Sequence, residues 1–569
     1  MHPKLNLKRL LQMADYQFDC GCSFSVKDPK HPVTLSQTGL PSIDFKIRES
    51  PYNCKMTWDL IKEGKTKGVF QLESNLGKSW AKRIRPNNIE ELAALTALIR
   101  PGCLKAIIDG KSMTQRYVDR KNGTEEVTYL HDALEPILES TQGVLVYQEQ
   151  SMQIAQVIAG FDLEQADSLR KAIGKKNATL MSEVKGSFLD GAEDKGLVTR
   201  EIAEEIFGWI EKSNRYAFNK SHAVSYAICG YWSAYAKAHF PVNFYCNYLY
   251  YADGKQDTQS EIREVVSDAR IHDVKVASPS IENMNSKFSI NGGVIHFGFN
   301  DIKSVGAKQV EKLVDAISTV ESFLEKPVVD WSWYQFLINA SHKINSKVCI
   351  ALVSVGAFSC FGLSRNKMIY EIDIWSKLTD KEKDWVIEKQ ENWTDIIPAL
   401  TELSPTKKMG GGTFNGTRSE LVRSLVLMLE TPPHSLDDSP SWASRVEKEY
   451  LGIPISYSEV DSCDTSAATA TCKEFFEGVK GDVTLAVQII DLKEYKLKKG
   501  QNKGRNMAFL TVEDGTGSID NVTVFCDDWE KHDATLYEGN TVLLYGGRSG
   551  RAQANKGNDG FVVKKVVQI

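Results

Sequence analysis

Two segments of the sequence place basic side chains beside helix ends, where they could bind phosphate groups. In FNKSHAVSYA, Lys220 and His222 stand at the start of a run of small residues that is typical of a helix. A helix N-terminus carries unpaired N–H groups and a partial positive charge, so a phosphate there can meet the helix end and the cation together. In LRKAIGKK, basic residues surround the flexible Gly174: Arg170, Lys171, Lys175 and Lys176. Taken alone, this second segment is better explained as a basic helix end exposed to solvent.

A third segment, at residues 298–317, resembles a helix-hairpin-helix motif. Its sequence is GFNDIKSVGAKQVEKLVDAI, with Gly306 in the tight hairpin and Lys303 and Lys308 on either side. Backbone N–H groups of such a hairpin, together with the two lysines, can hold a DNA phosphate without reading the base sequence. Hairpins of this kind also occur as plain packing units, and the residues alone leave both interpretations open.

A fourth segment, at residues 482–525, combines basic and aromatic side chains. Tyr495 and Phe509 could stack on bases, which with a basic groove is the sequence-tolerant way to bind single-stranded DNA. The alternative is a solvated hairpin tip, with Phe509 in the core. The basic residues are Lys493, Lys496, Lys498, Lys499, Lys503 and Arg505.

The elements that position these residues follow from length and periodicity. A chain of 569 residues is too long for one core, so three or four domains are expected. Apolar residues at three- and four-residue spacing predict a large helical domain over residues 55–250. FSINGGVIHFG predicts a β-hairpin, because Asn-Gly-Gly supplies the positive-φ turn. Beyond residue 480 the apolar residues alternate, with Gly turns at GTGS and GGRSG, which predicts a small closed barrel.

The fold class predicted is therefore a multidomain chain, mainly α-helical, that ends in an all-β barrel. Five segments are expected. They are a segment of unknown role at 1–45, a helical domain at 46–255, a linker hairpin with the helix-hairpin-helix at 256–325, a helical region with a Gly-rich loop at 326–455, and the barrel at 456–569.

Composition restricts the class of protein. With 42% hydrophobic and 25% charged residues the chain is that of a globular protein. No run of about 18 apolar residues occurs, so we expect no membrane contact and a cytoplasmic location. The net charge of −5 gives no global signature of nucleic-acid binding, so basic character must be local. Most cysteines stand singly among apolar residues, as reduced thiols do. Cys20, Cys22, His31 and Cys54 could bind zinc, but their irregular spacing fits loop or core cysteines better.

Five segments, in one order, give the helical domain a family resemblance. They resemble the fingers of the C-family replicative DNA polymerases, the family of the bacterial DNA polymerase III alpha subunit. With the helix-hairpin-helix and the barrel, which resembles the OB-fold of the same polymerases, the resemblance covers most of residues 46–569. The five are GVFQLES at 68–74, ALIRPG at 97–102, GVLVYQEQ with MQIAQ at 143–156, LRKAIGKK at 169–176 and FNKSHAVSYA at 218–227.

The resemblance implies roles for the basic residues. Arg170 and Lys171 stand where two basic residues of the family face the incoming deoxynucleoside triphosphate. The family commonly has Arg at the second position, so Lys171 offers a point charge in place of a planar fork. In IRPG, Pro101 and Gly102 are expected to end a helix and leave Arg100 at its edge. The nucleotide-binding residues expected are Arg100, Arg170, Lys171, Lys175, Lys176 and Lys220; the DNA-binding residues are Lys303, Gly306, Lys308, Lys496, Lys498, Lys499, Arg505 and Phe509.

Two smaller features remain open. His222 is as much a candidate for packing as for function, and Gln148, Glu149 and Gln150 are expected to form a structural polar network. QADSL at 165–169 looks like a peptide that binds a sliding clamp, but its apolar residues should be packed beneath Arg170. No convincing clamp motif is visible between residues 326 and 455, where the family usually has one.

The resemblance also implies chemistry that these residues do not supply. Polymerisation in this family uses two Mg²⁺ ions held by clustered carboxylates of a palm domain. No string of the type Pro-Asp-x-Asp-x-Asp occurs here, and LPSIDFKI offers only Asp44. The favoured interpretation is the fingers and DNA-binding portion of a DNA-directed DNA polymerase, which acts on primer-template, single-stranded template and dNTPs. Its palm is expected on a separate chain, an arrangement that fits a phage or another mobile replicon. The alternative is a non-catalytic DNA-binding accessory protein. A sliding clamp is an open partner.

Overall fold

The computed structural model describes residues 52–569 except 106, 109, 176–177, 215–216, 405–407, 410–411, 414–415 and 549–559. Before residue 52 it describes only four short strands, which are β1 (Asp15–Gln17), β2 (Ser23–Ser25), β3 (Val33–Leu35) and β4 (Pro41–Ile43). Cys20, Cys22 and His31 of the zinc hypothesis lie outside the described residues.

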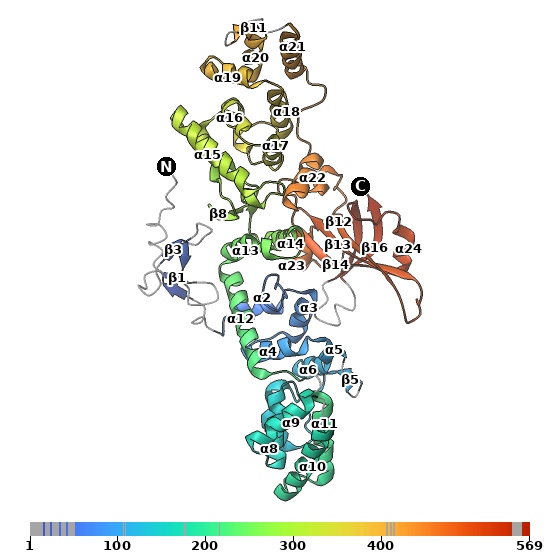
Figure 1. The fold of residues 1–569 in the computed structure, drawn as a ribbon. Coiled ribbons are helices and arrows are strands. Elements are labelled where there is room, and N and C mark those ends of the chain that lie inside the picture. Colours follow the sequence, from blue (N-terminus) through green and yellow to red (C-terminus); the bar gives the residue numbers. More distant parts are fainter. Residues whose placement is uncertain are drawn as a thin grey trace. The chain divides into compact units, whose positions relative to one another are not determined.

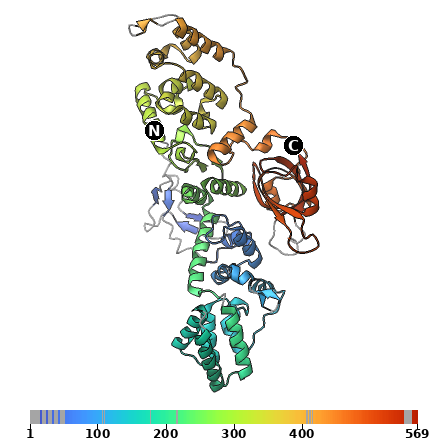
Figure 2. The same ribbon diagram turned by 45° about the vertical axis from the view of Figure 1, so that its right-hand side comes forward.

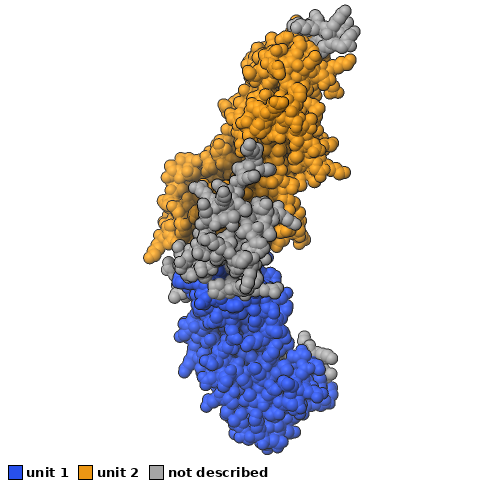
Figure 3. Space-filling model, turned by 90° about the vertical axis from the view of Figure 1, so that its left-hand side faces the viewer, with its two compact units in different colours: residues 1–34, 43–240, 550–558 blue, residues 35–42, 241–549, 559–569 orange. Residues whose placement is uncertain are grey.

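The chain divides into two compact units, coloured separately in Figure 3. The first unit comprises residues 1–34, 43–240 and 550–558. The second comprises residues 35–42, 241–549 and 559–569. The finer division into five segments stays a prediction.

The first unit is helical, as its periodicity predicts (Figure 1). A short pair of strands, β5 (Ile107–Ile108) and β6 (Lys111–Ser112), interrupts the helices. The helices are α2 (Lys55–Lys62), α3 (Asn75–Ile84), α4 (Ile89–Leu98), α5 (Pro101–Lys105), α6 (Met113–Lys121), α7 (Glu135–Leu138), α8 (Gln148–Ala159), α9 (Leu163–Lys175), α10 (Ala178–Lys195), α11 (Arg200–Asn214) and α12 (Lys220–His239).

Two hydrophobic cores hold this unit together. One joins α2 to α6 with α12, and the other joins α7 to α11. Small residues let α12 approach α4 closely, because Ala223 and Ala227 on α12 and Ala93, Ala94 and Ala97 on α4 are all buried. The run of small residues in FNKSHAVSYA therefore serves helix packing.

The second unit begins with helices. The predicted β-hairpin is confirmed: β8 (Ser289–Asn291) and β9 (Val294–His296) pair across Gly292 and Gly293, both at positive φ. Beside β9 runs β7 (Val276–Ala277). The helices are α13 (Pro241–Tyr250), α14 (Thr258–Ile271), α15 (Ala307–Leu324), α16 (Trp333–Asn339), α17 (Ser346–Ser354), α18 (Arg365–Ser376), α19 (Asp380–Glu388), α20 (Ile396–Leu403), α21 (Gly416–Glu430) and α22 (Pro440–Leu451), with the short strands β10 (Lys408–Met409) and β11 (Gly412–Thr413) before α21.

A closed five-stranded barrel follows, in the order β12-β13-β14-β16-β15 (Figure 2). The short helix α23 (Cys472–Glu477) precedes it, and α24 (Cys526–His532) connects β14 to β15. This strand order, with β14 and β16 parallel, confirms the predicted barrel and is that of an OB-fold. The strands are β12 (Asp482–Lys496), β13 (Asn506–Asp514), β14 (Gly517–Val524), β15 (Thr541–Arg548) and β16 (Phe561–Gln568).

The GTGS turn fixes the barrel to α14. Asp514 accepts hydrogen bonds from the N–H groups of Thr516 and Gly517, and from the N–H of Cys472 at the start of α23. A side chain at Gly517 would meet the side chain of Ile271 on α14, because an added Cβ would lie 2.6 Å from its Cγ1. Gly517 is thus required by close packing between the barrel and a helix of the same unit.

The second predicted turn, GGRSG, was wrong in part. Gly546 and Gly547 lie inside β15, where the register with β16 shifts between Tyr545 and Gly546. A Cβ at Gly546 would lie 2.0 Å from the backbone oxygen of Val562. A glycine in a strand often marks a bulge or a close backbone approach, and sequence alone does not separate these from a turn.

Among the described residues, no helix is both long and apolar enough to cross a membrane. The fold class predicted from the sequence, helices followed by a closed barrel, is confirmed.

Gly517→Ala should destabilise the second unit by about 1–3 kcal/mol, the usual cost of forcing an extra carbon into a packed contact. Thermal unfolding measures the change. The matched control is Gly515→Ala in the same turn, where the added Cβ would be 3.7 Å from the Cβ of Ser458, an ordinary contact. In an Ile271→Ala background, which removes the opposing Cγ1, Gly517→Ala should cost less than it does in the wild type. Equal stabilities of the two alanine variants would show that Gly517 is not a packing contact.

Candidate nucleotide and nucleic-acid interface

The starts of α8 and α12 meet in the first unit. The backbone of Tyr147 pairs with that of Phe218: the N–H of Phe218 donates to the oxygen of Val146, and the N–H of Gln148 donates to the oxygen of Phe218. Gln150 holds the segment before α8 in place, because its Oε1 accepts hydrogen bonds from the N–H groups of Val146 and Tyr147. The GVLVYQEQ and FNKSHAVSYA motifs therefore form one structural element.

A carboxylate already lies at the N-terminus of α12. The Oε2 of Glu149 accepts from the N–H of Lys220 at 2.9 Å, and its Oε1 accepts from Nδ2 of Asn219 at 2.9 Å. Asn219 in turn caps the helix through the N–H of His222. The expectation that a phosphate finds this helix end open needs correction, because the phosphate would have to displace Glu149. The polar network predicted for this motif is confirmed.

The side chain of Lys220 leaves the helix end and stays accessible. It is 39% exposed, and its Nζ lies 3.6 Å from Oε1 of Glu90. The ammonium group also lies 5.7 Å from the ring centre of Tyr147. Glu90 and the ring of Tyr147 lie beside the ammonium group without burying it. The role of Lys220 as a nucleotide contact stays a prediction.

Arg100 stacks on the same element. Its guanidinium carbon lies 3.3 Å from the ring centre of Phe218, and loss of solvent lowers the pKa of Arg100. His222 contacts Phe218 edge-on and lies 4.0 Å from the ring of Tyr226, between centroids. Residue 100 does not sit at the end of a longer helix, because α4 ends at Leu98 and α5 begins at Pro101. Exposed Arg100 thus stands in a short connection, supported by a ring.

The basic end of α9 is neutralised in part by its own helix. Asp167 accepts from Nε of Arg170 at 2.8 Å and from Nζ of Lys171 at 2.8 Å, and these bonds lower the pKa of Asp167. Both cations remain accessible, with 41% and 54% of their side chains exposed. Lys175 is the last residue of α9, and Lys176 lies outside the described residues.

The rejection of QADSL as a clamp peptide is confirmed. Ala166 and Leu169 are fully buried in the core formed by α7 to α11.

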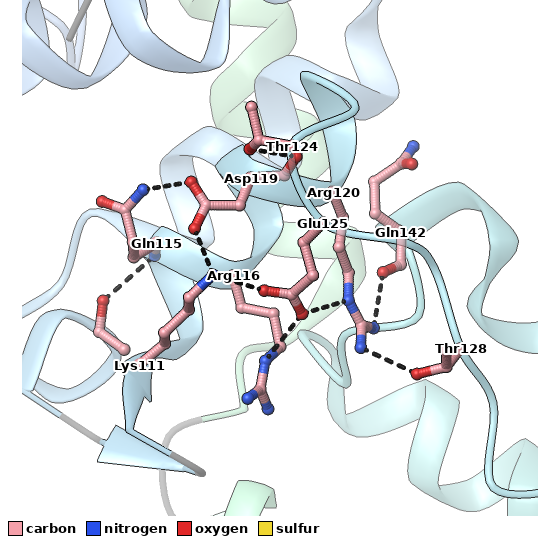
Figure 4. Close-up of polar contacts among 10 residues, drawn as sticks. Lys111, Gln115, Arg116, Asp119, Arg120, Thr124, Glu125, Thr128 and Gln142 are labelled. Carbon is pink, nitrogen blue, oxygen red and sulfur yellow. Dashed lines mark hydrogen bonds and ion pairs between the residues drawn. The ribbon is translucent and has the colours of Figure 1, made fainter. Parts of the chain in front are cut away.

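Sequence reasoning missed a charge cluster at α6, which Figure 4 shows. Glu125 lies within 3.0 Å of Nε of Arg120 and 2.9 Å of Nζ of Lys111. Partial burial acts to raise the pKa of Glu125, but hydrogen bonds from Lys111 and Arg120 leave it lowered. Arg120 also donates to the backbone oxygen of Gln142, directly before the GVLVYQEQ motif. The opposite charges of DRK and EE on either side of Asn122-Gly123-Thr124 were the available signal in the sequence. The cluster holds this loop in place.

The helix-hairpin-helix motif presents an open helix start. Its first element is a single 3-10 turn, Phe299–Asp301, and its second is α15. Gly306 is the N-cap residue of α15 and makes no side-chain cap, and an added Cβ there would meet nothing within 4 Å. Lys303 and Lys308 are exposed on either side. The positive φ of the hairpin falls on Ser304 at 71°, so Gly306 is not required by the backbone conformation.

Two contacts hold this hairpin at its base. The N–H of Lys303 donates to the backbone oxygen of Tyr450 on α22. Asp301 accepts from the N–H of Gly298, and its burial raises its pKa to about 7, against the opposing effect of Lys287 at 3.8 Å. The hairpin is therefore a fixed element on the second unit.

The β12–β13 hairpin of the barrel carries exposed lysines and rings. Lys496, Lys498, Lys499 and Lys503 are exposed. Phe509 is 40% exposed, whereas its neighbours Ala508 and Leu510 fill the core, so the alternative that Phe509 fills the barrel is wrong.

Arg505, predicted to contact DNA, is engaged within the barrel. Its Nε lies 2.8 Å from Oε1 of Glu530, and its Nη2 lies 2.6 Å from Oδ1 of Asp527. Both partners belong to α24. In this arrangement Arg505 fixes the hairpin to the helix, and a DNA contact by it stays a prediction.

Within the described part of the chain, no group of three or more His, Cys, Asp or Glu side chains could hold a metal ion. Buried Cys54 has a described partner, since its Sγ lies 3.2 Å from Nε2 of His239. A carboxylate cluster for Mg²⁺ is thus not formed by the described residues.

Comparison with known proteins supports the resemblance seen in the motifs. Residues 34–196 match the bacterial DNA polymerase III alpha subunit finger domain, and residues 273–368 match a helix-hairpin-helix motif. The chain is 31% identical over 530 residues to DNA polymerase III subunit alpha of Aquifex aeolicus, which covers 92% of this chain and 40% of that protein. The same subunit of Bacillus subtilis is 30% identical over 527 residues, covering 92% and 42%.

In Staphylococcus epidermidis the same subunit is 30% identical over 516 residues, covering 91% of this chain and 43% of that protein. The chain thus spans about two fifths of the length of these relatives. The similarity includes the finger domain and the helix-hairpin-helix motif. Over about nine tenths of its length the chain is therefore similar to part of the alpha subunit of DNA polymerase III.

Proposed function

We propose that this chain is the fingers and DNA-binding portion of a DNA-directed DNA polymerase. It binds the incoming dNTP through the first unit and the primer-template through the helix-hairpin-helix and the OB-fold. The observation that carries the proposal is the accessibility of the basic groups at each predicted contact: Lys220, Arg170 and Lys171 in the first unit, and Lys303 and Lys498 in the second.

The catalytic carboxylates are supplied by a palm on another polypeptide in this proposal. Two Mg²⁺ ions provide the polymerase chemistry by stabilising the attacking and leaving oxygens. The described residues do not fit these ions, because their carboxylates form no cluster. In this proposal the chain contributes positive charge at the triphosphate and contacts to DNA. It acts in the cytoplasm.

The second candidate is a non-catalytic DNA-binding accessory protein. Its favouring observation is that Glu149 already occupies the N-terminus of α12, and that Asp167 already engages Arg170 and Lys171. Such a protein would still bind DNA, but it would not need basic side chains that are accessible to a nucleotide.

Primer extension separates the two candidates. The chain is purified alone and together with the product of a neighbouring reading frame that carries clustered Asp residues, and extension is measured with Mg²⁺ and all four dNTPs. Activity only in the mixture supports the split polymerase. DNA binding without extension in every mixture would favour the accessory protein.

Arg170→Ala should raise the KM for dNTP or lower kcat by about tenfold or more in the active mixture, the loss of one charge-assisted phosphate contact. Steady-state kinetics measure the change. Arg200→Ala is the matched control, since Arg200 is an exposed arginine of the same unit that is also paired with carboxylates of a neighbouring helix. Unaltered kinetics of Arg170→Ala would remove Arg170 from the nucleotide site.

Gly306→Ser should weaken binding to primer-template DNA by about tenfold while leaving the unfolding temperature equal or slightly higher. Serine is a favourable N-cap residue and its Cβ meets no atom of the chain, but its side chain occupies the N–H groups and the space that a phosphate needs. Fluorescence anisotropy measures the affinity. Gly254→Ser, at another open glycine of the same unit, is the control. Unchanged affinity would make the hairpin a packing unit.

A further inference from the structure

The outer wall of the barrel is covered on two sides. On β12 and β15, Ala486 and Leu543 pack with Val460 of the 3-10 turn Glu459–Ser462. At the start of β14, Gly517 packs against Ile271 of α14. A further part of the wall is formed by the end of β12, the start of β13 and the end of β14.

Strand register places three aromatic rings on this part of the wall. Tyr495 pairs with Met507, and Phe509 pairs with Thr523. Val522 and Val524 point into the barrel core, so alternation turns Thr523 and Phe525 to the outside with Phe509. Met507 and Phe525 occupy the next row, because Ala508 pairs with Val524. Tyr495, Phe509 and Phe525 therefore share one face.

The rings of these residues are accessible and spaced apart. Tyr495 is 46% exposed, Phe509 40% and Phe525 50%, whereas Met507 between them is 7% exposed. Diagonal neighbours on adjacent strands lie roughly 7–8 Å apart, so we expect about this spacing between Phe509 and each of the other two residues. Within the described residues, no aromatic ring stacks on any of the three. Each residue is about half open to solvent, so a ligand whose planar groups recur at a similar spacing can reach the rings.

The charges around this face favour a polyanion. The same hairpin carries exposed Lys493, Lys496, Lys498, Lys499 and Lys503. Of the acidic residues that follow Phe525, Asp527 and Glu530 are paired with Arg505, and Asp528 lies 3.8 Å from Nζ of Lys531. The ion pairs of Arg505 also fix α24, whose N-cap residue is Phe525, to the hairpin.

We propose that Phe525 is a base-stacking residue for single-stranded DNA, which acts with Tyr495 and Phe509 on this face. The proposal rests on the function proposed above and extends it to a residue that the sequence patterns did not single out. Successive bases stack on the rings, and the hairpin lysines contact the phosphates. Lysines set the salt dependence of binding, and the rings add affinity that salt does not screen.

The test measures binding of a fluorescent thymidine oligonucleotide, about 16 nucleotides long to fill one OB-fold site, by anisotropy at several salt concentrations. Phe525→Leu keeps an apolar side chain but removes the aromatic face, so it should raise Kd roughly five- to hundredfold with an unchanged salt slope. Phe525→Trp should retain the affinity, and its fluorescence should be quenched by the oligonucleotide. Phe323→Leu, at an exposed ring on α15, is the matched control.

An abasic oligonucleotide of the same length isolates the stacking. It keeps the phosphates and removes the bases, so wild type and Phe525→Leu should bind it equally. Lys498→Ala with Lys499→Ala should lower the salt slope by roughly one to two units, since two phosphate contacts are lost.

The outcomes distinguish this inference from the function on which it rests. No binding of the oligonucleotide by wild type would overturn the single-strand function of the barrel. Wild-type binding with a lowered slope in the double lysine variant, but unchanged Kd in Phe525→Leu, would overturn the role of Phe525 alone. An equal loss by Phe525→Leu on the abasic oligonucleotide would likewise exclude stacking.

Discussion

One carboxylate joins the two halves of the first unit. The N-termini of α8 and α12 meet at the bridge between Tyr147 and Phe218, and both ends carry partial positive charge. Arg100 and Lys220 add two full charges nearby. Glu149 satisfies N–H groups at this junction and reduces the repulsion. Without Glu149 the positive charge at this junction would be less well compensated, with Glu90 still 3.6 Å from Nζ of Lys220.

The same junction determines where the predicted nucleotide contacts lie. The backbone bridge positions Phe218, whose ring supports the guanidinium of Arg100. The helix that starts beside it is held by small residues against α4, so Lys220 projects from a rigid element. Arg120 donates a hydrogen bond to the backbone oxygen of Gln142, a few residues before Tyr147. This bond links the charge cluster at α6 to the junction of α8 and α12. The basic residues are arranged by packing and caps that lie in different parts of the sequence.

Periodicity predicted most of the fold. Three- and four-residue spacing gave the helices, and alternation gave the barrel, because both patterns report which face is buried. The roles of single glycines were not predictable in the same way. Gly306 was expected to make the hairpin turn, but Ser304 takes the positive φ. Gly517 and Gly546 are required by atoms of Ile271 and Val562, which no local pattern reveals.

Partners of charged residues were the other part that sequence could not supply. Basic residues were recognised as clusters, but the acids that engage them, such as Asp167 and Glu530, carry no periodic signal. Exposed ion pairs of this kind contribute little to stability, because solvent screens them. A multiply charged phosphate forms stronger, charge-assisted hydrogen bonds. Such pairs can therefore hold a cation in position and still yield it to a phosphate, which reconciles a net charge of −5 with basic contact surfaces.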